Sequence, residues 1–246
     1  MKFERQEHVI IAEALQSMDH GFLERSKCYF GGGTAIVLMN GEYRLSLDVD
    51  FLCADIDGYR ELRSAIVQRG APAVFGAEVE TLREFKADQY GIRGLVSLHG
   101  QRIKFEIVRE ARIALAGEAS PFGVPMLTVE SQFAEKLLAN ADRCLDKSVA
   151  YRDAIDLGYL VHSNGSIPAK SIEIAEIAYG GDVVRSVGKV LERLGKASEI
   201  EHAAETLSMS RDAVLEAALA LQGASIAAWP EADFPEVPAK EETYGR

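Results

Sequence analysis

A segment of alternating apolar and polar residues constrains the fold of this chain more than any other feature. From Arg44 to Phe51 the sequence reads Arg-Leu-Ser-Leu-Asp-Val-Asp-Phe, a period of two that predicts a β-strand. In such a strand the apolar residues face a core, and the polar residues form one row on the opposite face. The members of that row are Arg44, Ser46, Asp48 and Asp50.

A solvated strand face needs only polar residues, so two aspartates two positions apart in this row call for a further explanation. Asp48 and Asp50 repel each other, and the pair becomes favourable when both carboxylates share a divalent cation, which prefers hard oxygen ligands. A solvated strand face is the alternative for an Asp-x-Asp alone. We expect a third acid on a neighbouring strand, and Glu106 in the alternating segment 102–108 can supply it. Three such carboxylates predict a site for two Mg²⁺ ions, although Glu106 alone also fits an exposed strand position.

A glycine turn lies upstream of the aspartates. Gly31-Gly32-Gly33-Thr34 follows a short predicted strand over 27–30 and opens a predicted helix over 34–39. Glycines let backbone N–H groups approach a phosphate closely, and the first turn of a helix favours anions. Together with the paired aspartates, this order of elements predicts a site for a triphosphate and its metals.

The hydrophobic periodicity divides the chain into two halves of different secondary structure. Further predicted strands cover 77–86, 92–98 and 102–108, with a tight turn at His99-Gly100 between the last two. Predicted helices cover 4–19, 58–68, 128–144, 150–162, 170–179, 183–194 and 210–221. We therefore expect an α/β domain over 1–126, a helical domain over 127–228 and an acidic, proline-containing tail over 229–246.

Charge and cysteine content narrow the class of function. The chain has 38 acidic and 27 basic residues, a net charge of −11, which argues against broad, non-specific binding of nucleic acid. An RNA substrate would therefore need a local basic region near the active site. Three widely spaced cysteines form no zinc pattern and suit a reducing compartment. Without a signal peptide or an apolar run long enough to cross a bilayer, we expect a cytoplasmic protein with no membrane partner.

The helical half carries a second group of charged residues. Lys136 adjoins an apolar stripe, Arg143 follows two turns later, and Asp153 and Asp156 share one helix face. A solvated face with ion pairs explains this spacing. Alternatively, Lys136 reaches the phosphates of a nucleotide, and an aspartate orients a lysine, binds the acceptor or accepts its proton. The histidines have no spacing typical of a metal site, and we expect surface or turn positions for all of them. They are His8, His20, His99, His162 and His202.

Four blocks of the sequence resemble the AbiEii/AbiGii-type nucleotidyltransferase toxins of the polymerase-β-like superfamily. The blocks are Gly-Gly-Gly-Thr-Ala (31–35), the Arg-x-Ser-x-Asp-x-Asp-Phe segment (44–51), Lys-Phe-Glu (104–106), and Glu-Lys-Leu-Leu-Ala (135–139) with Arg143 and Arg-Asp-Ala-Ile-Asp-Leu (152–157). The resemblance covers roughly residues 25 to 160. It implies an α+β fold, in which a nucleotidyltransferase core with a short mixed or antiparallel sheet precedes a helical domain.

The resemblance also implies roles for single residues. The metal ligands are Asp48, Asp50 and Glu106; the residues at the nucleotide are Gly32, Gly33, Thr34, Arg44, Ser46 and Lys136; and Asp153 is a further active-site acid. Two positions depart from the family pattern. Glu106 stands where the family usually has an aspartate, and Arg152 stands where it frequently has a lysine.

We therefore expect a Mg²⁺-dependent enzyme that moves a nucleoside monophosphate from an NTP to a hydroxyl acceptor and releases pyrophosphate. In parts of the family the acceptor is the 3′ end of tRNA. The resemblance implies the toxin of a toxin–antitoxin or phage-defence pair, with a cognate antitoxin. Protein and small-molecule hydroxyls are alternative acceptors. A non-catalytic nucleotide-binding or regulatory protein on the same scaffold is the alternative to an enzyme.

Overall fold

The computed structural model describes residues 2–76 and 79–238, which form two compact units. The first unit contains residues from 2–42 and 46–132, and the second contains residues from 43–45 and 133–238. Of the predicted tail, residues 239–246 lie outside the described part. No helix in the described part is long and apolar enough to cross a membrane.

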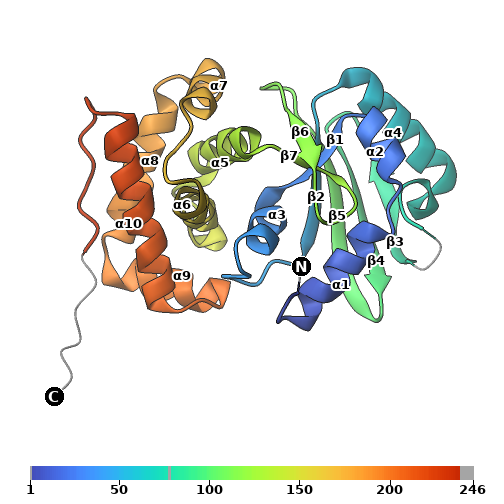
Figure 1. The fold of residues 1–246 in the computed structure, drawn as a ribbon, viewed down its shortest axis with the longest axis horizontal. Helices are drawn as coiled ribbons and strands as arrows, with labels where there is room; N and C mark the ends of the chain where they lie inside the picture. Colours follow the sequence, from blue (N-terminus) through green and yellow to red (C-terminus); the bar gives the residue numbers. More distant parts are fainter. Residues whose placement is uncertain (1, 77–78, 239–246) are drawn as a thin grey trace. The chain divides into compact units, whose positions relative to one another are not determined.

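The described part of the first unit is built on a seven-stranded mixed sheet. Its strands are β1 (Cys28–Gly31), β2 (Asp48–Cys53), β3 (Glu80–Ala87), β4 (Gly91–Leu98), β5 (Gln101–Arg109), β6 (Gly117–Ala119) and β7 (Pro125–Leu127). They lie in the order β3-β4-β5-β2-β1-β7-β6 (Figure 1). Strand β2 is parallel to β5 and β1 is parallel to β7, whereas the other neighbours are antiparallel. The predicted α+β class with a mixed sheet is confirmed.

Helices cover the apolar face of this sheet. They are α1 (Gln6–Gln16), α2 (His20–Arg25) and α4 (Ile56–Arg69), while α3 (Gly32–Met39) connects β1 to the segment before β2 (Figure 1). Their apolar side chains join those of the strands in one core, which includes the mutually tilted rings of Phe30, Phe51 and Phe105. The Asp55 side chain caps α4 by accepting from the N–H of Gly58 at 2.8 Å.

Strand β2 is shorter than predicted, because it begins only at Asp48. Arg44 and Ser46 therefore do not belong to its polar row, and the prediction was wrong at this end. Competing interactions explain the difference. The guanidinium of Arg44 donates hydrogen bonds to the carboxylate of Asp156, and the hydroxyls of Ser46 and Thr34 are hydrogen-bonded to each other. From Asp48 onward the predicted alternation of core and polar positions holds.

The second unit is helical in its described part. Its helices are α5 from residue 133 onward (Val129–Arg143 in full), α6 (Arg152–Asn164), α7 (Ala169–Tyr179), α8 (Asp182–Leu194), α9 (Ala197–Leu207) and α10 (Arg211–Ala228). Helix α9 was not predicted, and α10 continues beyond the predicted end at 221. At Gly158 of α6 a Cβ atom would lie 2.1 Å from the carbonyl oxygen of Ala217, so glycine permits the close packing of α6 on α10.

The described part of the tail packs against these helices. The indole N–H of Trp229 donates to Glu176 at 2.8 Å, and the side-chain amide of Gln222 donates to the carbonyl of Pro235. Val237 is buried. Residues 229–238 are therefore part of the second unit, despite their prolines and acidic residues.

Candidate functional site

Three acidic side chains lie on one face of the sheet in the first unit. In the parallel pairing of β2 with β5, Asp50 is opposite Glu106 and Asp48 is opposite Lys104. Directly opposed residues point to the same face of a sheet. The three predicted metal ligands therefore share the face opposite the core.

Basic side chains already contact two of these carboxylates. The Arg93 Nε donates to Glu106 Oε1 at 2.7 Å, and Lys104 Nζ lies 3.8 Å from Asp48 Oδ2 and 3.9 Å from Glu106 Oε2. Within residues 2–76 and 79–238, no three His, Cys, Asp or Glu side chains are close enough to hold a metal ion. The donor set still fits Mg²⁺ in kind, because Asp48 and Asp50 are hard oxygen donors on one face of one strand. Arg93 holds one oxygen of Glu106, Oε1.

The glycine turn lies directly against Asp50. Gly31 is paired with Asp50 across β1 and β2, and Gly32 opens α3 with a φ of +70°. A Cβ atom at Gly32 would lie 2.9 Å from Asp50 Oδ2. Only glycine combines this backbone conformation with this approach. Gly31 has no side chain that could cap α3, and the N–H groups in the first turn of a helix favour an anion.

Thr34 and Ser46 are held by each other and by a buried histidine. Their hydroxyl oxygens are 2.8 Å apart. The Ser46 N–H donates to His8 Nε2 at 3.4 Å, and His8 Nδ1 lies 2.7 Å from Glu42 Oε1. His8 is fully buried, so the prediction of a surface or turn position was wrong for it. The polar partners that allow its burial are 34 and 38 residues away in the sequence, and spacing alone does not reveal them.

The second unit contains a buried ion network. It consists of Arg44, Lys136, Arg143, Asp153 and Asp156. Asp156 accepts from Arg44 Nε at 2.8 Å, from Arg44 Nη2 at 3.0 Å and from Lys136 Nζ at 2.6 Å. The hydroxyl of Tyr43 donates to it as well, at 2.6 Å. Asp153 accepts from Lys136 Nζ at 3.0 Å and from Arg143 Nη2 at 2.9 Å.

The pKa values of both aspartates of the network are lowered. Burial by itself would raise the pKa of Asp156, but the charges of Arg44 and Lys136 outweigh burial and lower that pKa. Lys136 and Arg143 lower the pKa of Asp153 in the same way, again against the effect of burial. The alternative of a solvated helix face is wrong, because Lys136, Asp153 and Asp156 are buried and paired between elements. Arg143, which also pairs with Asp153, is partly exposed. Lys136 contacts two carboxylates, and its contact with a nucleotide stays a prediction.

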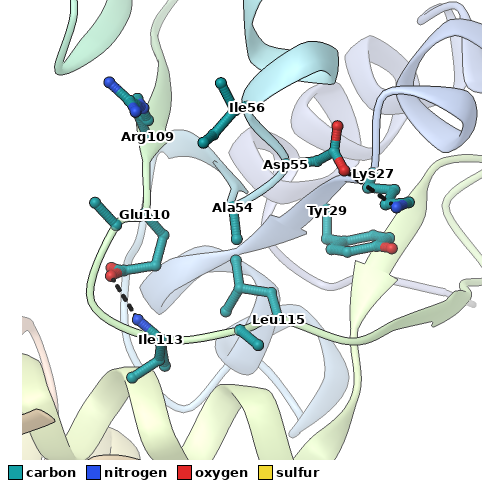
Figure 2. A pocket seen from close by; sticks show the side chains of 11 residues that line it. Lys27, Tyr29, Ala54, Asp55, Ile56, Arg109, Glu110, Ile113 and Leu115 are labelled. Carbon is teal, nitrogen blue, oxygen red and sulfur yellow. Dashed lines mark hydrogen bonds and ion pairs between the residues drawn. The ribbon is translucent and has the colours of Figure 1, made fainter.

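A pocket of about 410 Å³ lies in the first unit where β2 and β5 end (Figure 2). Lys27 pairs with Asp55 there at 3.1 Å. Glu110 accepts from the N–H of Ile113 at 3.3 Å and pairs with the guanidinium of Arg112 at 2.6 Å. The acids of this pocket are therefore paired within the unit. None of the predicted site residues, all of which the structure describes, lines it.

Comparison with known proteins identifies a family and a fold. A family model described as "Nucleotidyl transferase AbiEii toxin, Type IV TA system" matches residues 15–233. Two crystal structures from Helicobacter pylori are similar to this chain, each with 16% sequence identity. The structure of a candidate nucleotidyltransferase superposes with a TM-score of 0.54, and the match covers 95% of this chain and 100% of that protein chain. The structure of JHP933 superposes with a TM-score of 0.53, and the match covers 94% of this chain and 96% of the JHP933 chain. At this identity they show a shared fold. No curated protein matches the chain.

Proposed function

Because the chain belongs to the AbiEii nucleotidyl transferase toxin family of type IV toxin–antitoxin systems, we propose that it transfers a nucleoside monophosphate from an NTP to a hydroxyl acceptor. One observation carries the proposal: the glycine turn packs against Asp50. A helix start suited to phosphate thus lies beside a pair of carboxylates suited to a cation. This combination serves phosphoryl-type transfer, which depends mainly on positioning and on stabilisation of charge.

In this proposal Asp48 and Asp50 would hold Mg²⁺, and Glu106, whose Oε1 accepts from Arg93, would be a third ligand. Bound magnesium would neutralise charge on the phosphates and activate the attacking hydroxyl. The contribution of the chain itself is placement. Strand β2 presents both aspartates on one face, and the register with β5 places Glu106 beside Asp50.

The phosphates of the NTP bind at the start of α3 in this proposal. The N–H groups of Gly32 and Gly33 belong to the uncapped first turn. Thr34 is buried, and its hydroxyl is bonded to Ser46. We therefore assign Thr34 and Ser46 the task of fixing the turn, rather than a direct contact with phosphate.

The family resemblance assigns Lys136 to the nucleotide and Asp153 to the active site, whereas Arg44 is assigned here to the buried ion network. Lys136→Met and Asp153→Asn test the first two roles when transfer and thermal stability are measured together. A loss of transfer at unchanged melting temperature would support a direct role. A parallel loss of both would assign the residue to the stability of the second unit.

The acceptor is RNA in the finer form of the proposal, with the 3′ end of tRNA as the first candidate. The supporting feature is a set of basic side chains next to the carboxylates, which we call the basic rows. They are Arg83, Lys86, Arg93 and Lys104, and Arg102 lies two residues before Lys104 on the same face of β5. The first row runs across the sheet from Lys86 through Arg93 and Glu106 to Asp50.

The second row runs from Arg83 through Leu95 and Lys104 to Asp48. Opposed residues share a face, so the positive charge borders the carboxylates although the whole chain is acidic. Phosphates of a polynucleotide are the ligands that such rows of Lys and Arg favour. This local charge favours RNA over protein or small-molecule hydroxyls.

We further propose that the protein acts in the cytoplasm and has a cognate antitoxin as its partner. The family is that of toxins in type IV toxin–antitoxin systems. All three cysteines are free and buried, which suits a reducing compartment. Co-purification from the native host tests the partner.

The decisive experiment incubates the protein with each α-labelled NTP, Mg²⁺ and either total RNA or total protein. We expect label in the RNA fraction and release of pyrophosphate. The double variant Asp48→Asn with Asp50→Asn should lose labelling while it keeps its melting temperature. The control is Asp57→Asn with Glu61→Gln, which removes the same charge from an exposed part of α4.

Each possible result of this experiment distinguishes between the alternative functions. Labelling by the double variant at the wild-type rate would refute the metal-site assignment. Label in protein or in small molecules would replace the RNA acceptor. Binding of NTP without pyrophosphate release, for all four NTPs, would favour the non-catalytic alternative.

A further inference from the structure

A buried histidine links the N-terminal helix to the segments that carry the candidate site. His8 lies in α1 and is 0% exposed. Its Nδ1 is 2.7 Å from Glu42 Oε1, and its Nε2 accepts from the N–H of Ser46. Glu42 in turn accepts from the N–H groups of Glu4 at 2.7 Å and Arg5 at 3.2 Å. The start of α1 is therefore tied to the segment between α3 and β2.

These contacts select one form of the imidazole. The Ser46 N–H can only donate, so His8 Nε2 must be an unprotonated acceptor. The carboxylate of Glu42 accepts the proton of Nδ1. Both ring nitrogens are thereby satisfied in a neutral ring, as a buried polar group requires. A side chain that lacks an acceptor at this point would leave the Ser46 N–H without its partner.

The same contacts reach both halves of the candidate site. Ser46 lies two residues before Asp48, where β2 begins, and its hydroxyl bonds to Thr34 in the first turn of α3. Displacing Ser46 would move the glycine turn relative to the aspartates. A shift of this kind weakens binding of a ligand that both segments contact.

We propose that His8 is a positioning residue for the nucleotide, acting through the Ser46 N–H to hold the glycine turn and the start of β2 in place. The role rests on the proposed transfer reaction and deepens it. His8 does not touch the substrate in this proposal. Its effect is on the affinity of the site for the NTP.

Three variants separate the two hydrogen bonds of the ring. His8→Gln places an amide oxygen near the position of Nε2 and can accept from Ser46. His8→Asn places an amide N–H near the position of Nδ1, so it keeps only the bond to Glu42. His8→Phe loses both. The control His20→Asn alters a half-exposed side chain elsewhere in the first unit.

We expect His8→Asn and His8→Phe to raise the KM for NTP about five- to tenfold, the factor for one hydrogen bond of ordinary strength. His8→Gln should stay within about twofold of the wild type. The dissociation constant of a non-hydrolysable NTP analogue should follow the same order. A variant that only lowers the folded fraction would reduce the maximal rate and leave KM unchanged. KM is therefore the deciding measurement.

The outcomes separate this inference from the proposed function. If His8→Asn keeps the wild-type KM, or if His8→Gln is as impaired as His8→Phe, positioning through Ser46 is wrong while transfer stands. If the wild type binds NTP but transfers nothing, the proposed transfer reaction is wrong. The role of His8 then stands or falls on whether the dissociation constants of the NTP analogue follow the expected order of the variants. If the wild type binds no NTP, both are overturned.

Discussion

Asp156 is the residue of the buried ion network at which we expect a substitution to cost the most stability. It is 0% exposed and accepts from Arg44, Lys136 and Tyr43. Asp156→Asn keeps the shape of the side chain but removes its charge, so two cations remain in a buried site with one carboxylate fewer. Removing one partner of a buried ion pair typically costs about 3–5 kcal/mol. Because the asparagine oxygen can still accept one hydrogen bond, we expect about 3 kcal/mol.

The assay is thermal and urea unfolding followed by circular dichroism. For a chain of this length, 1 kcal/mol corresponds to about 2–4 °C, so the melting temperature should fall by roughly 6–12 °C. The matched control is Asp57→Asn, whose carboxylate is 81% exposed and pairs with Arg60 on the surface. That change should cost no more than about 1 kcal/mol.

A double-mutant cycle sharpens the test. Arg44→Met and Asp156→Asn remove the two sides of one interaction, so their combined effect should be smaller than the sum by at least about 1 kcal/mol. Additive effects, or a fall in melting temperature below 2 °C for Asp156→Asn, would contradict the assignment of a buried, energetically coupled network.

Three further predictions concern the glycine turn, the pH dependence of the ion network and the basic side chains near the carboxylates. Gly32→Ala places a Cβ atom 2.9 Å from a carboxylate oxygen at a φ of +70°; its strain of about 1–2 kcal/mol should lower kcat/KM for NTP about five- to thirtyfold in a transfer assay. The pKa values of both network aspartates lie below their usual range, so the unfolded chain binds protons first as the solution becomes acidic. Stability should hold above about pH 5 and fall progressively below it, as melting temperatures between pH 7 and pH 2.5 will show. Arg83→Ala with Arg102→Ala should weaken RNA binding and reduce the slope of log affinity against log salt by about 1.4 if both residues contact phosphates, as filter binding at several salt concentrations will reveal.

Much of the first unit could be predicted because its signals are local. The His99-Gly100 turn has positive φ at both residues, +51° and +81°, and joins β4 to β5 as the flanking alternation predicts. The glycine turn opens α3, and the aspartates of β2 face away from the core. Each of these features depends on neighbouring residues and on the period of side-chain direction.

The features that sequence reasoning missed depend on distant partners. Arg44 matched the period of the strand, yet its carboxylate partner lies 112 residues away. His8 has Glu4 and Glu7 near it in the sequence, yet the acid that it contacts is Glu42, 34 residues away. Burial of a charge or an imidazole is decided by such partners, and periodicity contains no information about them.

The departure of Glu106 from the usual aspartate has a physical consequence in this structure. Residue 106 lies opposite Asp50 on one side and opposite Arg93 on the other. A glutamate is one methylene longer than an aspartate, and that length lets its carboxylate reach Arg93 Nε at 2.7 Å. Arg93 thereby holds one oxygen of Glu106 on a sheet face where Asp48, Asp50 and Glu106 lie at neighbouring positions.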